Sequence, residues 1–290
     1  INTLGMTGPK TNFANSILIS GDAGTGTLNA AENNTGVGVG VFGALTTGDK
    51  NTAVGLSALL ANTTGHSNTA VGCGALVTNT TGHSNISLGV NSLKLNQTGY
   101  SNIAIGKDAL QSNTTGFNNV ATGQSALAAN TEGEENVAVG FTALDANTEG
   151  NSNVAVGSSA LGANTTGGNN AAVGTAALAA NTTAANNTAF GHDSMKTNTT
   201  GASNTTVGQA SLYANTTGLK NVATGRNVLT ANTTGCCNTA MGFEALKTNT
   251  TANDNVAVGN VALKMNTTGA NNTALGAYSL QANTTGASNV

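Results

Sequence analysis

Only a few side chains in this 290-residue sequence have types and spacings that could support chemistry. His66 and His83 are seventeen positions apart, and Asp49 precedes His66 by the same interval. A metal ion bound by a protein usually has three or four ligands. Because no other acidic residue adjoins the two histidines at this interval, we predict no metal site here.

Two carboxylates share the same spacing. Glu149 follows Glu132 by the same seventeen positions, and paired carboxylates can serve acid–base catalysis or bind a cation. A solvated acidic patch, which Glu134 and Glu135 would extend, is the simpler interpretation. The glycine-rich segment 21–26 lacks the Lys-Ser/Thr ending and the following helix of a phosphate-binding loop. No nucleophile is spaced with a base, so we predict neither an enzyme nor a bound cofactor.

The interval that separates these pairs is the period of the whole sequence. With Asn34 as position 1, residues 34–288 hold fifteen consecutive copies of the pattern N-[TV]-A-V-G-x-x-A-L-x-x-N-T-T-G-x-x, without an insertion or a deletion. Position 5 is Gly in all fifteen copies, position 12 is Asn in fourteen, and position 9 is Leu in thirteen. A fixed short period is typical of solenoid proteins, in which each unit packs only on its neighbours.

Each repeat has room for two short extended segments. Positions 2–4 alternate β-branched residues about a small one, which indicates a strand, and Ala-Leu at positions 8 and 9 indicates a second strand. Asn-Thr-Thr-Gly at positions 12–15 indicates a turn, and Gly, Asn, Thr and Val are poor helix formers. We therefore predict an all-β fold, a parallel β-solenoid (β-roll) of two-strand, 17-residue coils. Stacked strands lie about 4.8 Å apart, so fifteen coils would extend for about 70 Å, and His66 and His83 would lie about 5 Å apart.

Position within the repeat predicts the role of each residue. An invariant Gly at position 5 indicates positive φ or no room for a Cβ atom, and Leu at position 9 is expected to be the main core residue. The structural residues predicted on this basis, together with position-1 asparagines, are Gly55, Gly72, Gly140, Gly157, Leu59, Leu127, Leu144, Asn68, Asn136 and Asn153. Charged residues of the repeat region fall only at positions 6, 7, 10, 14, 16 and 17, which we expect to face solvent.

Position 3 is a candidate contact between chains. On a strand it points away from positions 2 and 4, which we expect to face the core, so position 3 should face outward. It is nevertheless Ala in twelve of the fifteen copies, as at Ala138, Ala155 and Ala172. Small size at an outward position indicates that another chain packs there. Crowding within the strand is the alternative explanation.

The asparagines at positions 1 and 12 can be explained in two ways. Their side-chain amides can bond to the equivalent amides of neighbouring coils and so form ladders. At position 12 most copies, such as Asn62 and Asn79, also match the Asn-x-Ser/Thr acceptor of N-glycosylation. Asn130 and Asn147 keep the asparagine but lack that motif, which favours the ladder.

The composition bears on several classes of function. Charged residues are 7% and aromatic residues 3% of the chain, and the formal net charge is −3, so a nucleic-acid-binding surface has no support. No apolar run is long enough for a transmembrane helix. The three cysteines, Cys73, Cys236 and Cys237, are too irregular for a disulfide framework, and we expect them to be surface thiols.

Residues 1–33 lie outside the repeat. We expect them to form an N-terminal strand at Ile17–Ile19 and a cap over the first coil, because the end of a solenoid exposes unpaired strand edges. Residues 34–290 are expected to form the solenoid domain, with the start of a further copy at Asn289. The chain begins with Ile1 and not with Met, so we expect a piece of a longer protein.

Three segments carry a resemblance to a known family. Residues 136–140, 153–157 and 255–259 each read Asn-Val-Ala-Val-Gly, which resembles the Ser-Val-Ala-Ile-Gly core of the head repeats of YadA-like trimeric autotransporter adhesins. The longer unit with Asn-Thr-Thr-Gly is similar to repeat arrays of phage-type tail fibres. The resemblance implies a left-handed parallel β-roll of three chains at a cell or virion surface. This repeat is longer than the usual head repeat, a difference that affects coil shape and trimer packing.

These observations predict a structural extracellular fibre or adhesin shaft that supplies reach, stiffness and multivalent attachment to a host or environmental surface. An ice- or carbohydrate-binding solenoid that uses the repeated threonines is one alternative, and a phage tail-fibre segment for host recognition is a second. A solenoid enzyme would need acidic and basic residues clustered on adjacent coils, which this sequence does not offer. We expect self-association as a trimer or filament, with no nucleic-acid partner and no membrane span.

Overall fold

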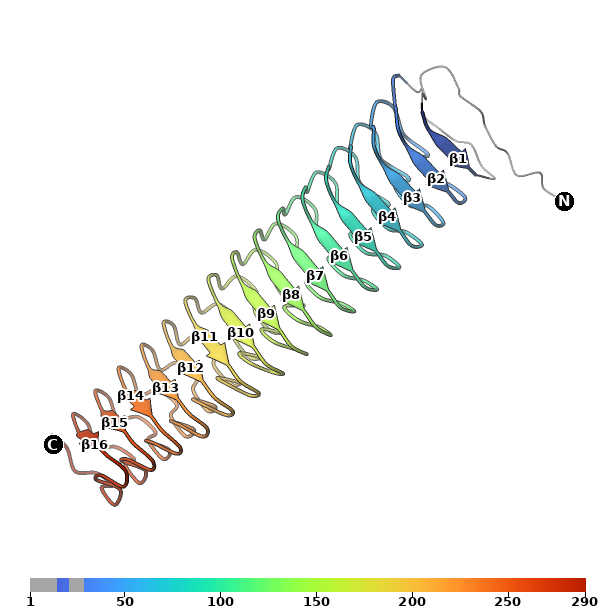
Figure 1. Cartoon of the computed structure of the whole chain (residues 1–290). Helices are drawn as coiled ribbons and strands as arrows, with labels where there is room; N and C mark the ends of the chain where they lie inside the picture. Colours follow the sequence, from blue (N-terminus) through green and yellow to red (C-terminus); the bar gives the residue numbers. More distant parts are fainter. Residues whose placement is uncertain (1–14, 21–28) are drawn as a thin grey trace. The chain divides into compact units, whose positions relative to one another are not determined.

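The computed structural model describes residues 15–20 and 29–290. It is an all-β structure, a parallel β-solenoid of about fifteen turns in which each coil corresponds to one copy of the repeat (Figure 1). The chain divides into two compact units, Ile1–Glu149 (unit 1) and Gly150–Val290 (unit 2). The predicted fold class and coil length are therefore confirmed.

Each coil contributes one strand of three residues, at positions 2–4 of the repeat. Unit 1 contains β1 (Ile17–Ile19), β2 (Thr35–Val37), β3 (Thr52–Val54), β4 (Thr69–Val71), β5 (Ile86–Leu88), β6 (Ile103–Ile105), β7 (Val120–Thr122) and β8 (Val137–Val139). Unit 2 contains β9 (Val154–Val156), β10 (Ala171–Val173), β11 (Thr188–Phe190), β12 (Thr205–Val207), β13 (Val222–Thr224), β14 (Thr239–Met241), β15 (Val256–Val258) and β16 (Thr273–Leu275).

Strands pair in sequence order, parallel and in register, from β1 to β8 in unit 1 and from β9 to β16 in unit 2. Equivalent positions meet, so that Ala53 lies opposite Ala70. The predicted strand at Ile17–Ile19 is confirmed, and its Leu18 lies opposite Gly36 of β2. Residues 1–14 and 21–28 of the predicted cap lie outside the described residues.

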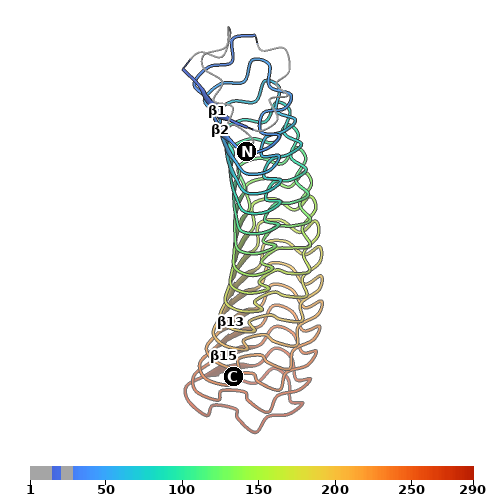
Figure 2. The ribbon, with the colours of Figure 1, turned by 90° about the vertical axis from the view of Figure 1, so that its right-hand side faces the viewer.

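The prediction of a second strand at positions 8 and 9 is wrong. Positions 6–11 form turns, closed in one coil by the Ala75 N–H to Gly72 O bond (3.4 Å) and the Asn79 N–H to Leu76 O bond (3.2 Å). Position 7 has a left-handed backbone, as at Asn91 with φ of 56°, which suits the third residue of a type II turn. Figure 2 shows the strands of unit 1 along one side of the coils and the turns on the other side.

Hydrogen bonds between coils continue through the turns. The Leu59 N–H donates to Ala75 O of the next coil (3.1 Å), and the Thr63 N–H donates to Thr80 O (3.0 Å). The Ser57 N–H donates in the opposite direction, to Val39 O of the preceding coil (2.8 Å). Irregular backbone inside a protein needs such partners for its polar groups. The stacking of coils therefore stabilises the turns as well as the strands.

The core of each coil is thin and is filled by positions 3, 8 and 9. Ala53, Ala58 and Leu59 have no exposed surface, which confirms position 9 as the main core residue. In the first coil a Cβ atom on Gly36 would come within 2.9 Å of the Phe42 ring, so position 3 faces position 9. In this coil the larger Phe42 at position 9 is thus matched by the smaller Gly36 at position 3, as expected where the core volume is fixed.

The predicted orientation of the strand is therefore wrong. Ala138, Ala155 and Ala172 are fully buried inside their own coils and cannot form a contact between chains. Their small size follows from the short distance between the strand and position 9, a crowding that acts across the core and not within the strand. Positions 2 and 4 face outward instead, as Val137 and Val139 do.

Two pairs of buried hydroxyl groups face each other in the core, while the buried Ser211 hydroxyl donates instead to the Ala223 carbonyl. The hydroxyl of Ser87 at position 3 contacts that of Ser92 at position 8, and Thr206 Oγ1 lies 2.6 Å from Ser194 Oγ. A buried hydroxyl without a partner costs about 1–3 kcal/mol, so a hydroxyl on one side of the core favours another on the facing side. Within the described residues, every buried side-chain nitrogen or oxygen has a hydrogen-bond partner.

Two asparagine ladders run through the interior of each unit. At position 1, Asn68 Nδ2 and the Asn68 N–H both donate to Asn51 Oδ1, at 3.1 and 3.0 Å. At position 12, Asn79 Nδ2 donates to Asn62 Oδ1 at 2.7 Å. Asn68 Nδ2 and Asn79 Nδ2 also donate to the Gly82 carbonyl, each at 2.9 Å. The predicted ladders are confirmed, and the position-15 carbonyl joins them within each coil.

Positions 5 and 9 also have an unusual backbone. The position-5 glycines have positive φ, as at Gly72 (141°), and a Cβ atom on Gly106 would lie 2.5 Å from Gly123 O. Both proposed reasons for this glycine are therefore confirmed. Position 9 is left-handed as well, as at Leu59 and Leu127 (φ 52° for both). A left-handed L-residue costs about 1–2 kcal/mol, which burial of a leucine, worth about 1.5–3 kcal/mol, offsets.

Candidate interaction surfaces

The outward face of the sheet is uncharged and mostly apolar along each unit. We call positions 2 and 4 of all coils the sheet face. Position 4 is Val, Leu, Ile, Phe or Met in thirteen coils and Thr in two, and position 2 is Thr in seven coils and Val, Ile or Ala in the others. Val71 and Ile105 in unit 1 are each 39% exposed, and Phe190 and Met241 in unit 2 are 46% and 43% exposed. Contiguous exposed apolar surface usually marks contact with another molecule. The sheet face is therefore the candidate interaction surface of each unit.

The residues predicted as structural belong to the scaffold beneath this face. Positive φ is shared by Gly55, Gly72, Gly140 and Gly157. Full burial is shared by Leu59, Leu127, Leu144, Asn68, Asn136 and Asn153. The last three are members of the position-1 ladder. These residues hold the coils in register and leave positions 2 and 4 on the outward side of the strand.

The sequence does not lead to the prediction of the sheet face as an exposed surface, because its alternation of residues favours positions 2 and 4 as core residues. A signal of the correct orientation was present in the range of side-chain sizes. Position 2 includes Ala171, and position 4 includes Phe190 and Met241. A close-packed, thin core does not accept such a range of volumes, whereas a solvent-facing surface does. The nearly constant Ala at position 3 carried the same information.

A second surface feature is a column of stacked rings at position 16 in unit 1. Ring centroids lie 4.8 Å apart for His66 and His83, 5.1 Å for His83 and Tyr100, and 4.8 Å for Tyr100 and Phe117. The planes of the two histidine rings are inclined by only 3°. The predicted separation of His66 and His83 is confirmed, and one ring per coil continues the column.

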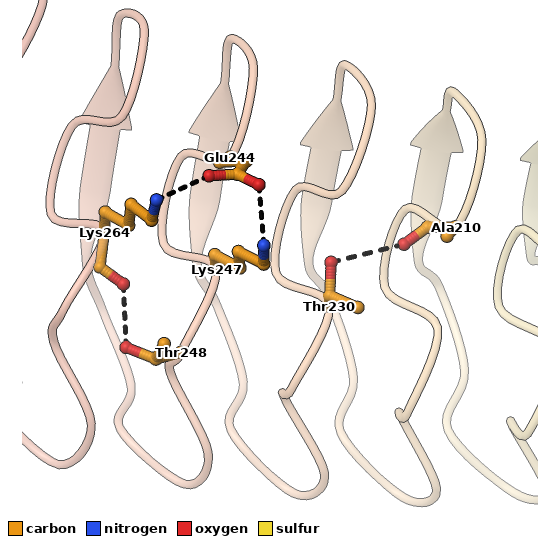
Figure 3. Close-up of polar contacts among 6 residues, drawn as sticks. All are labelled: Ala210, Thr230, Glu244, Lys247, Thr248 and Lys264. Atoms are coloured by element: carbon orange, nitrogen blue, oxygen red, sulfur yellow. Dashed lines mark hydrogen bonds and ion pairs between the residues drawn. The ribbon is translucent and has the colours of Figure 1, made fainter.

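Charged side chains lie on the turns, where some of them pair across coils. The Glu244 carboxylate accepts from Lys247 Nζ at 2.6 Å and from Lys264 Nζ of the next coil at 2.7 Å (Figure 3). These two hydrogen bonds hold the pKa of Glu244 below its ordinary value. A hydrogen bond from Lys196 Nζ to Asp193 (3.0 Å) raises the pKa of Lys196. The Lys196–Asp193 pair is at the surface and contributes little to stability. Glu244 at position 7 is buried, with 9% of its surface exposed, so the predicted solvent exposure of position 7 is wrong for this residue.

The remaining acidic residues form no metal centre among the described residues. Glu132 and Glu149 are exposed at position 14 of adjacent coils, as expected for a solvated patch. Asp145 is half-buried, and burial raises its pKa against the opposing effect of the Asp145 and Ala146 backbone N–H groups. Across residues 15–20 and 29–290, no three His, Cys, Asp or Glu side chains are placed to hold one metal ion.

The two threonines of the turn have different environments. Thr63 Oγ1 at position 13 donates to the Thr80 carbonyl of the next coil at 3.0 Å, whereas Thr64 at position 14 is exposed. The position-12 amide nitrogens of Asn62 and Asn79, to which a glycan would be attached, are buried and donate hydrogen bonds. The ladder, and not glycosylation, therefore accounts for asparagine at this position.

The cysteines are at the surface, as predicted. Cys73 and Cys237 are exposed, Cys236 is half-buried, and all three are free thiols. In the described part of the chain, no helix has the length and apolar character needed to cross a membrane. Comparisons of the chain with protein-family models, with curated proteins and with solved structures find no match.

Proposed function

We propose that this chain is a structural fibre segment at a cell or virion surface, and that it associates with two further copies of itself through the sheet face. The observation that carries the proposal is the charge-free, mostly apolar outward surface that positions 2 and 4 form along each unit. The in-register ladders of hydrogen bonds supply stiffness, and repetition of the coil supplies length. The resemblance to adhesin head repeats and tail-fibre arrays supports the surface location and the trimer.

A second copy of the chain is the partner that fits the sheet face best. The face repeats once per coil, at the strand spacing of about 4.8 Å, and another copy offers side chains with the same period. Side chains at positions 2 and 4 of two chains can therefore interdigitate over many coils. A globular partner has no such period and would cover only a few coils. The absence of charge along the face also means that the identical faces of three chains can converge without repulsion.

The direct test is the oligomeric mass of the 290-residue chain in solution. Native mass spectrometry of the parent chain should give the mass of three chains. A variant with Val71→Lys, Ile105→Lys and Val139→Lys places three charges on the sheet face of unit 1, where they point to solvent in a single chain. Burying these charges between chains would be costly, so this variant should give the mass of one chain with an unchanged far-ultraviolet circular dichroism spectrum.

A matched control variant carries the same number of introduced lysines, placed away from the sheet face. Thr64→Lys, Thr98→Lys and Thr115→Lys lie at position 14, on the exposed turn of three coils. This control variant should keep the mass of three chains. A parent chain that is monomeric at every accessible concentration, or a sheet-face variant that assembles as the control does, would contradict the proposal.

Ice binding is a second candidate function, which one observation favours. Exposed threonines recur at position 14 in thirteen of the fifteen coils, so a file of hydroxyl groups follows the strand spacing. The position-13 hydroxyls are bonded inside the stack, which leaves a single file and not a broad array. Thermal hysteresis that Thr64→Lys and Thr98→Lys abolish would support ice binding. Freezing behaviour like that of an unrelated protein at equal concentration would exclude it.

A further inference from the structure

The histidine pair of the position-16 column places two metal-ligating side chains next to each other. His66 and His83 come from adjacent coils, their ring centroids are 4.8 Å apart and their planes are parallel within 3°. His66 is exposed and His83 is half-buried, so solvent reaches both. Imidazole nitrogen is a good ligand for Zn²⁺, Cu²⁺ and Ni²⁺. The pair therefore places two suitable donors side by side at the surface.

Both rings are held in the same orientation. His66 Nδ1 lies 3.4 Å from Ser67 Oγ, and His83 Nδ1 lies 3.4 Å from Ser84 Oγ, so each ring faces the serine that follows it. A hydrogen bond at Nδ1 fixes which ring nitrogen remains for a metal. The repeated contact therefore leaves the Nε2 atoms of both rings at equivalent edges of the column.

We propose that His66 and His83 chelate one divalent transition-metal ion through their Nε2 atoms. A metal–nitrogen distance of about 2.0–2.1 Å requires the two nitrogens to lie within about 4 Å of each other. In the stacked arrangement the in-plane lone pairs of the two Nε2 atoms are parallel, so both rings must rotate out of the stack about their side-chain torsions before the lone pairs converge on one ion. The solvent-accessible position of both side chains leaves room for this rotation. Water completes the coordination, because no third His, Cys, Asp or Glu in the described part of the chain is placed to join.

Stacking alone is the competing explanation of the geometry. Tyr100 and Phe117 continue the column at similar spacings although neither can act like an imidazole ligand. The column would then stabilise adjacent coils and bind nothing. The two explanations differ in one measurable respect, since only chelation requires both histidines at once.

Titration calorimetry with Ni²⁺ at neutral pH distinguishes them. The parent for all variants carries Cys73→Ser, Cys236→Ser and Cys237→Ser, because these thiols are at the surface and would bind metal themselves. His66→Phe and His83→Phe remove one donor each and keep a ring in the column, as Phe117 does in the same position. His192→Phe is the control, because His192 lies in unit 2 beside Asp193 and has no histidine neighbour.

The parent should bind one Ni²⁺ at the pair. Either substitution in the pair should weaken this binding ~10-fold or more, because loss of a ligand should reduce the affinity at least as much as loss of a residue that only hydrogen-bonds to a ligand. His192→Phe should bind as the parent does. Binding should also weaken as the pH falls, because protons compete with the metal for imidazole. Equal affinity of the parent and the His66→Phe, His83→Phe double variant would overturn the proposal. So would single variants that each retain the affinity of the parent, which would mean independent single-histidine binding.

Discussion

The interior ladders make Asn102 one of the most sensitive positions in unit 1. Its Nδ2 donates to Asn85 Oδ1 at 3.2 Å and to Gly116 O at 2.8 Å. Its Oδ1 accepts from the N–H and from Nδ2 of Asn119, at 3.0 and 3.2 Å. Asn102→Ala removes all four hydrogen bonds from a fully buried site. The substitution thus tests whether the ladder stabilises the fold or only accompanies it.

The expected loss of stability depends on which of these hydrogen-bonding groups keep another partner in the variant. Gly116 O still accepts from Asn113 Nδ2, and Asn119 Nδ2 still donates to Gly133 O. The Asn119 N–H, however, is left buried without its acceptor. Four hydrogen bonds at about 0.5–1.5 kcal/mol each, and an orphaned donor at about 1–3 kcal/mol, predict a loss of about 3–5 kcal/mol once partial relaxation is allowed for.

Amide hydrogen exchange is the appropriate assay, because a repeat protein can open locally without global unfolding. A loss of this size should speed exchange in β5, β6 and β7 by about 100-fold or more. The control is Gln111→Ala in the same coil, which removes one 3.3 Å bond from Gln111 Nε2 to Asp108 at the surface. The reasoning is refuted if exchange in these strands is as slow in Asn102→Ala as in Gln111→Ala.

Three further predictions concern the backbone and the charged residues. Gly106→Ala should lower the free energy of unfolding by about 3 kcal/mol or more, because alanine would be strained at this positive φ and its Cβ atom would overlap the Gly123 carbonyl oxygen. Gly74→Ala lies at a position where other coils already have Ala and should cost only about 1 kcal/mol; urea titration measures both. Asp145→Asn should stabilise the chain at neutral pH, because burial penalises the charged carboxylate and raises its pKa in the folded state. At a pH below the carboxyl range the variant should be no more stable than the parent, because the carboxyl is then uncharged. Equal melting temperatures of parent and variant at neutral pH would contradict this prediction. Glu244→Gln should cost about 1–3 kcal/mol at neutral pH, because the buried carboxylate accepts hydrogen bonds from two lysines. The lowered pKa of Glu244 means that this stabilisation is present above the unfolded pKa and is lost as the pH falls through the folded pKa, so the substitution should cost nothing in strong acid. A cost that persists in strong acid would show that packing, and not charge, is responsible.

The period of the sequence was enough to predict the coil and much of its interior. One invariant glycine per repeat indicated the positive φ at position 5, and a nearly invariant leucine indicated the core residue, as at Gly72 and Leu76. The ladders followed from amide chemistry, because equivalent asparagines in stacked coils must meet. Each of these predictions depends on one residue type that only one backbone environment explains well.

The turns and the orientation of the strand were less accessible from the sequence. Leucine at position 9 adopts a left-handed backbone that its residue type does not indicate, so Ala-Leu was assigned to a strand. Positions 7 and 17 did carry a signal, because Gly, Asn, Asp and Ser are frequent there, and these residues favour left-handed turns. A chain that turns at positions 7, 9 and 17 forms a narrow coil, in which the space between the strand and position 9 accepts no residue larger than Ala, Ser or Thr at position 3. The apolar residues of positions 2 and 4 are then left outside.

The stacking of one repeat on the next is the claim on which the proposals depend, and distances between paired spin labels test it directly. Labels on cysteines introduced at Thr47 and Thr115, at Thr47 and Glu132, or at Thr47 and Glu149 lie four, five and six coils apart at position 14 of unit 1, in the parent that lacks native thiols. With labelled chains diluted by unlabelled ones, pulsed electron resonance should give about 19, 24 and 29 Å, an increase of one strand spacing per repeat. Distances that do not increase by this step, or that are broadly distributed, would contradict the solenoid.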